Sequence, residues 1–252
     1  MMTLRQTYEK WLQLTKYKST LPIGRCLALA ILAGAYIGFG GVAALMAQGL
    51  LGGAAGRIAG ACVFPAGLMM ITLVGGELFT GNCLMFGPLF TGRASPRQVL
   101  SRLLLVYLGN FIGACCVALV TAASGVLDGM GTAWPALIRQ AVESKARLSF
   151  GTALLRGVLC NILVCTAIWA ASGAASTGGK AVACFFPIML FVLCGMEHCV
   201  ANMFYFPLGL LNGADITLAD CLLRNLLPVT LGNIAGGMLL SCLFAMFYQY
   251  QD

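Results

Sequence analysis

The stretch GMEHCVANMF, residues 195–204, holds the side chains of this chain best suited to proton chemistry. The only histidine, His198, directly follows Glu197 inside an otherwise apolar run. An imidazole has an ordinary pKa of about 6.5, so small changes in its surroundings move it across physiological pH. His198 could therefore exchange a proton or bind an anion, and the alternative is a packed, hydrogen-bonded core histidine.

The composition indicates that this ionisable pair lies in a membrane. Of 252 residues, 60% are hydrophobic and 9% are charged, whereas a soluble domain has about 25% charged residues. Apolar blocks long enough to span a bilayer recur along the chain, which predicts an all-α polytopic membrane protein rather than a β-barrel of short alternating segments. The net charge of +7 comes without a basic cluster interleaved with aromatic residues, so nucleic-acid binding is not expected.

Six spans are predicted, and two of them contain an interruption. The second breaks at GGELFTGN and the fifth breaks at GMEHCVAN; the expected spans cover 26–50, 58–91, 103–123, 152–174, 181–211 and 226–248. Residues 1–25 are predicted to be a cytoplasmic tail or amphipathic helix, and 26–250 a channel domain. Lysine and arginine are more frequent in the connections on the side of the membrane where the N-terminus lies than in those on the other side. This bias favours a cytoplasmic-membrane protein with both termini cytoplasmic.

The two interruptions share a pattern, GxExxxxN. Glu77 and Asn82 in the first copy lie 120 residues before Glu197 and Asn202 in the second. LGNFIG and LGNIAG lie 123 residues apart in nearly the same register. The chain therefore reads as two three-span repeats, 26–123 and 152–248. An odd number of spans per repeat gives the copies opposite orientations, an arrangement typical of transporters with a site at the midplane.

Broken helices free backbone groups that need partners inside a membrane. We predict that Glu77 and Glu197 bind the freed amides and that Asn82 and Asn202 do the same. The other interpretation is that these two carboxylates face a pore, where they would repel anions. Lys145, in ESKARLSF before the fourth span, is either an interfacial anchor or part of a funnel that attracts anions.

The twelve cysteines contain no CxxC pair and lie mostly inside predicted spans. Free cysteine behaves as a small hydrophobic residue, so we expect no metal site, disulfide or cofactor. A membrane enzyme or haem protein would need more ligands than one histidine. A structural membrane protein does not explain the duplicated interruptions.

The motifs AGAYIGFGG, GGELFTGN, GMEHCVANMFYFPLG and NLLPVTLGNIAGG occur in an order that resembles the formate–nitrite transporter family over about residues 26–250. The resemblance implies an aquaporin-like fold, a homopentamer with one pore in each protomer, and no enzymatic activity. It also implies small monovalent anions: formate first, with nitrite or hydrosulfide as alternatives. A water or glycerol channel would have a similar fold, but the paired asparagines are not in an Asn-Pro-Ala sequence.

The resemblance also assigns pore positions. It implies roles in solute or proton handling for His198, Thr80, Lys145, Asn161 and Asn233. It implies two hydrophobic constrictions, one of Phe64 and Leu68 on the cytoplasmic side and one of Leu78, Phe79 and Phe191 on the other. Glu77 and Cys199 replace the Asp and Ser of formate channels from enteric bacteria, which leaves the substrate open. The hypothesis is that an anion takes up a proton near His198 and crosses as the neutral acid.

Overall fold

Apolar segments form the membrane-spanning helices of the computed structural model, which describes residues 2–249. Five helical segments are long and apolar enough to span a bilayer: Ile23–Leu51, Gly53–Val74, Pro96–Ser124, Phe150–Gly173 and Asp220–Tyr248. Two shorter apolar helices, Thr177–Leu193 and Cys199–Leu211, together supply the sixth crossing. The predicted all-α, six-span architecture is confirmed.

The described chain contains helices α1 to α12, two 3-10 helices, η1 and η2, and one π-helix, η3. Their bounds are α1 (Leu4–Thr20), α2 (Ile23–Leu51), α3 (Gly53–Val63), α4 (Ala66–Val74), α5 (Phe79–Asn82), η1 (Cys83–Met85), α6 (Phe86–Phe90), α7 (Pro96–Ser124), η2 (Asp128–Ala133), α8 (Trp134–Ala146), α9 (Phe150–Gly173), α10 (Thr177–Leu193), α11 (Cys199–Leu211), η3 (Asp220–Leu226) and α12 (Leu227–Gln249).

Both predicted helix breaks are present. Gly75 follows α4 with φ of 116°, and Gly195 follows α10 with φ of 66°. L-residues with side chains rarely adopt these angles, so glycine lets the chain leave each helix. The chain then runs without helix until α5 begins at Phe79 and α11 begins at Cys199.

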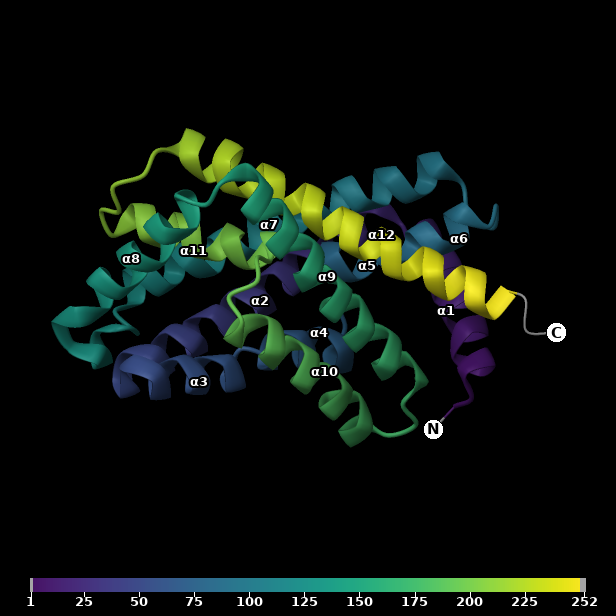
Figure 1. The fold of residues 1–252 in the computed structure, drawn as a ribbon, viewed down its shortest axis with the longest axis horizontal. Coiled ribbons are helices and arrows are strands. Elements are labelled where there is room, and N and C mark those ends of the chain that lie inside the picture. Colours follow the sequence, from purple (N-terminus) through teal and green to yellow (C-terminus); the bar gives the residue numbers. More distant parts are fainter. Residues whose placement is uncertain (1, 250–252) are drawn as a thin grey trace.

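Each half of the molecule contains one close helix pair. The chain packs α2 along α7 in the first half, and α9 along α12 in the second (Figure 1). A methyl group at Gly113 would collide with the Ile31 carbonyl, and one at Gly232 would collide with the Leu154 carbonyl. Glycine therefore permits the same close backbone approach in both halves, as expected of an inverted repeat.

Helix α1 packs against the ends of the spans. The rings of Tyr8 and Tyr248 lie 6.1 Å apart, and those of Trp11 and Trp169 lie 5.2 Å apart. Both chain ends consequently lie at one end of the molecule, with α3 and α8 at the other (Figure 1). We refer to these as the α1 side and the α8 side.

Candidate functional site

His198 lies at the second helix break, where its backbone becomes the N-cap of α11. Its Nδ1 accepts a hydrogen bond from the Ala201 backbone N–H at 3.1 Å. Its Nε2 lies 2.9 Å from the Thr80 hydroxyl oxygen. Because Nδ1 is an acceptor, a neutral ring carries its proton on Nε2 and donates it to Thr80. The structure thus brings together two predicted pore residues that are 118 positions apart.

Two aromatic rings stand beside the imidazole. Phe191 stacks on His198 with ring centroids 5.7 Å apart and planes 14° apart. Phe64 meets Phe191 edge-on at 5.8 Å. The histidine therefore lies directly next to an apolar aromatic pair.

An ion pair holds the α8 side of this break. Lys145 donates to Glu197 at 2.8 Å, and the Asn202 amide donates to the other Glu197 oxygen at 2.7 Å. Asn225 donates to that same oxygen at 3.3 Å and to the Lys145 carbonyl at 3.0 Å. Only 3% of the Glu197 side chain is exposed, so its charge depends on these partners.

The first break contains the same arrangement on the α1 side. Lys18 donates to the Glu77 carboxylate at 3.0 Å and to the side-chain oxygen Oδ1 of Asn82 at 2.8 Å. The Asn82 amide donates to Glu77 at 2.7 Å. Lys18 lies five residues before α2, as Lys145 lies five residues before α9. The two clusters are therefore counterparts in the inverted repeat.

Two asparagines bind the backbone groups that the breaks release. Asn110 accepts from the Phe79 N–H at 2.8 Å and donates to the carbonyls of Ala30 and Glu77 at 2.7 and 2.8 Å. In the second half, Asn233 accepts from the Cys199 N–H at 2.9 Å and donates to the carbonyls of Gly157 and Glu197 at 2.8 and 3.0 Å.

The binding of amides by Glu77 and Glu197, expected from the sequence, is wrong for their side chains. The described carboxylate contacts go to lysine and asparagine side chains instead. Asparagine is better suited to the amide role because it can accept from an N–H and donate to carbonyls at once. Solute contact by Asn161 and Asn233 stays a prediction; both amide hydrogens of Asn233 are already engaged, and Asn161 donates to the Asn233 carbonyl at 2.5 Å.

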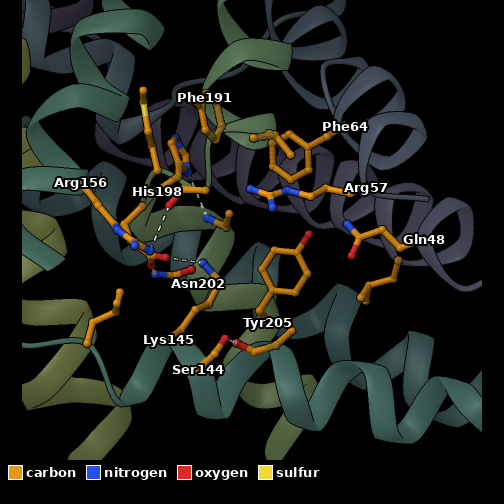
Figure 2. Close-up of a pocket in the computed structure, with 18 residues that line it drawn as sticks. Gln48, Arg57, Phe64, Ser144, Lys145, Arg156, Phe191, His198, Asn202 and Tyr205 are labelled. Carbon is orange, nitrogen blue, oxygen red and sulfur yellow. Dashed lines mark hydrogen bonds and ion pairs between the residues drawn. The ribbon is translucent and has the colours of Figure 1, made fainter. Parts of the chain in front are cut away.

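Two cavities approach the centre from opposite sides. The α8-side cavity, about 520 Å³, is lined by Lys145, Glu197, His198, Phe64 and Phe191 among others (Figure 2). The α1-side cavity, about 490 Å³, is lined by Lys18, Glu77, Asn82, Ile71 and Leu78 among others. Arg57 and Arg156 also line the α8-side cavity, where the single carboxylate, Glu197, is paired with Lys145.

The constriction residues group differently from the expectation. Phe64 and Phe191 face one another on the α8-side cavity, whereas Leu78 lines the α1-side cavity. The grouping of Phe191 with Leu78 was therefore wrong, while the side of the membrane that each constriction faces stays a prediction. Phe191 lies on α10, which packs against α3 and α4 on either side of Phe64, so the two rings meet although they belong to different repeats. Leu68 and Phe79 are buried and line neither cavity.

Sequence reasoning missed Lys18, Asn110 and Asn225 as site residues. A signal existed for two of them. Asn110 lies in the LGN motif that matches Asn233, and Lys18 has the same spacing to its following span as Lys145. Asn225 corresponds to Arg102 in the register of the LGN motifs, a residue of another type, and its contacts with Glu197 and Asn202 reveal its role.

A sequence model of the formate/nitrite transporter family matches residues 5–248. The chain belongs to the formate/nitrite transporter family. Members are channels and transporters, not enzymes. This membership confirms the resemblance and agrees with the paired breaks and the membrane-spanning architecture.

Relatives within the formate/nitrite transporter family match most of the chain. A probable formate transporter of Methanothermobacter thermautotrophicus is 38% identical over 94% of this chain and 93% of its own length. The formate channel FocA of Haemophilus influenzae is 35% identical over 72% of this chain and 70% of its own.

Solved structures show the same fold. An ion channel of the family superposes with a TM-score of 0.84 at 28% identity, covering 99% of this chain and 98% of that one. A structure described as a pentameric formate channel with formate bound has a TM-score of 0.75 at 28% identity, covering 90% of this chain and 96% of its own.

Proposed function

We propose that this protein is a channel for the anions of small weak acids, with formate as its substrate, and that formate crosses together with a proton. The observation that carries the proposal is the Thr80–His198 pair beside the Phe64–Phe191 rings, between two cavities. The formate transporters and channels among its relatives support the substrate. Nitrite and hydrosulfide are the alternatives within the family.

The first step is attraction of the anion into the α8-side cavity. Lys145 is neutralised by Glu197, so Arg57 and Arg156 supply the net positive charge there. As the anion leaves water, its charged form loses solvation and its affinity for a proton rises. A proton taken from water in the cavity converts formate into formic acid.

The neutral acid then passes the aromatic pair, because burying it costs far less than burying the anion. The Thr80 hydroxyl oxygen accepts a hydrogen bond from the Nε2–H of His198, so the hydroxyl hydrogen of Thr80 is free to donate to the acid. His198 acts here as a fixed donor, since a second ring proton would displace the Ala201 N–H from Nδ1. In the α1-side cavity the acid releases its proton to water.

Formate flux into proteoliposomes, measured with a pH-sensitive dye inside, tests this function. Flux should be faster at pH 5 than at pH 8, and each formate should carry one proton. Equal flux at both values without proton movement would contradict the neutral-acid route. Osmotic swelling with glycerol, measured in parallel, would reveal an aquaporin-like channel for neutral solutes instead.

Replacing His198 with Phe should abolish the pH-dependent flux of formate, because the fixed donor to Thr80 is lost. Thr80→Val provides the matched variant, since it removes the other partner and leaves the N-cap bond to Ala201 intact. Both variants should slow formate flux in the assay above. An unchanged formate flux in His198→Phe would assign the histidine to packing.

The assembly and placement proposed for the channel follow the same relatives. We propose a homopentamer in the cytoplasmic membrane, with the α1 side in the cytoplasm and the α8 side outside; the similar channel described as pentameric supports the oligomer. Native mass spectrometry should give five times the chain mass of 26.4 kDa. The division into an N-terminal segment, 1–25, and a channel domain, 26–250, remains part of this proposal.

A further inference from the structure

We propose that Arg57, Gln48 and Tyr205 form a binding subsite in the α8-side cavity for a small planar anion with two oxygen atoms, such as a monocarboxylate. The three side chains come from α3, α2 and α11, and all line this cavity together with Phe64. The subsite lies before the aromatic pair on the proposed route. It rests on the proposed function for its substrate class.

Most N–H donors of the Arg57 guanidinium are not engaged by the described part of the protein. Its Nη2 donates to the Leu193 carbonyl at 2.9 Å, which fixes the guanidinium at the end of α10. A guanidinium carries five N–H donors, so most of them stay available. Within residues 2–249, Arg57 forms no ion pair with a carboxylate. Its positive charge is thus held at the cavity without being neutralised.

Gln48 and Tyr205 supply neutral donors. Within the described residues, neither the Gln48 amide nor the Tyr205 hydroxyl forms a hydrogen bond. Gln48 lies over Gly60, where an added Cβ would come within 2.8 Å of its Nε2, so the absence of a side chain at Gly60 makes room for the amide. The Tyr205 hydroxyl points to the part of the cavity where Arg57 and Gln48 lie (Figure 2).

These donors match a carboxylate. The planar fork of an arginine binds two oxygens side by side, which a single-atom anion such as hydrosulfide cannot use fully. An amide N–H and a phenol O–H can complete the coordination of the same oxygens. Phe64, lining the same wall, offers an apolar surface to the carbon end of the ligand.

The two halves show whether the side chains of Gln48 and Tyr205 are needed for helix packing. Gln48 corresponds to Ala171 in the helix register set by Gly34 and Gly157, and Tyr205 corresponds to Met85 in the GxExxxxN register. Ala171 and Met85 both line the α1-side cavity, where Lys180 is the basic residue near the start of α10. The repeat folds without the glutamine and tyrosine donors there, so helix packing does not require them on the α8 side.

The test measures formate flux and binding on the full-length protein. Arg57→Gln should raise the half-saturating formate concentration about tenfold, as expected for losing a charge-assisted hydrogen bond, and leave saturating flux nearly unchanged. Tyr205→Phe should raise it about threefold. Since the Tyr205 hydroxyl has no described protein partner, its loss removes no described hydrogen bond of the fold. Benzoate should raise the unfolding temperature of the wild type and much less that of either variant.

Two controls locate the effect. Arg224→Gln removes an exposed arginine that pairs with Asp220, and Lys180→Gln removes one of the basic residues that line the α1-side cavity, the one that corresponds to Arg57 in the repeat; both should bind benzoate as the wild type does. The subsite is refuted if Arg57→Gln and Tyr205→Phe leave both readouts unchanged, or if Lys180→Gln weakens benzoate binding as much as Arg57→Gln does. A wild type that binds benzoate through Arg57 but conducts no formate would contradict the proposed function and support the subsite.

Discussion

At the residue scale, the centre of this protein depends on polar groups that satisfy one another. Each carboxylate at a helix break is bound by a lysine and by at least one asparagine. A further asparagine in each half binds the backbone amide at the start of the next helix, at Phe79 and at Cys199. A buried charge without partners costs several kcal/mol. The charged pairs therefore stabilise the breaks only as complete sets, which makes paired substitutions informative.

Lys18→Met should destabilise the protein by roughly 3 kcal/mol, because it leaves Glu77 buried without its cation. Adding Glu77→Gln removes the unpaired charge and should recover much of the loss. Thermal unfolding in detergent, followed by circular dichroism, measures both. A double variant less stable than Lys18→Met would show that the ion pair is not what holds Glu77.

Asn110→Ala should be among the most damaging small substitutions, since it removes three buried hydrogen bonds to the backbone. We expect a loss of about 3–6 kcal/mol. Asn212→Ala is the matched control, because its side chain donates only to the Leu208 carbonyl. Equal unfolding temperatures for the two variants would argue against a role of Asn110 in holding the break.

At the element scale, the close pairs α2–α7 and α9–α12 set the position of the breaks. Asn110 and Asn233 are carried by α7 and α12, and each reaches the break across a glycine-lined contact. Widening either contact would withdraw the asparagine from the amide that it binds. Helix spacing therefore controls the geometry around Thr80 and His198.

Gly232→Ala tests this coupling, because the added methyl would collide with the Leu154 carbonyl on α9. It should lower both stability and formate flux, with a cost of about 1–3 kcal/mol. Gly151→Ala, also on the α9–α12 pair, meets no atom within 4 Å and should leave both quantities unchanged. If Gly232→Ala has the unfolding temperature and the formate flux of the wild type, the spacing of α9 and α12 does not control the site.

At the scale of the whole molecule, the inverted repeat places similar clusters at opposite ends of the pore. The chain ends lie together on the α1 side, where α1 packs on the spans, and α8 closes the other side (Figure 1). The two sides differ in the groups around the clusters. One such difference is His198, which corresponds to Leu78 in the first half.

Reporter fusions test the placement of the two sides. Alkaline phosphatase fused at either terminus should be inactive in a bacterial host, because both ends are expected in the cytoplasm. A fusion within residues 128–131, in the connection before α8, should be active on the other side. Opposite results for the two termini would contradict the six-span arrangement.

The sequence alone determined the membrane-spanning segments, the two breaks and the family, because apolar length and glycine-rich motifs are local properties of the chain. It also singled out Thr80, Lys145 and His198. It could not show that Lys18 binds Glu77, that Asn110 and Asn233 rather than the glutamates bind the freed amides, or that Phe64 faces Phe191. These contacts join residues far apart in the sequence, and only the packing of the helices decides which of them meet, within a repeat for the asparagines and between the repeats for Phe64 and Phe191.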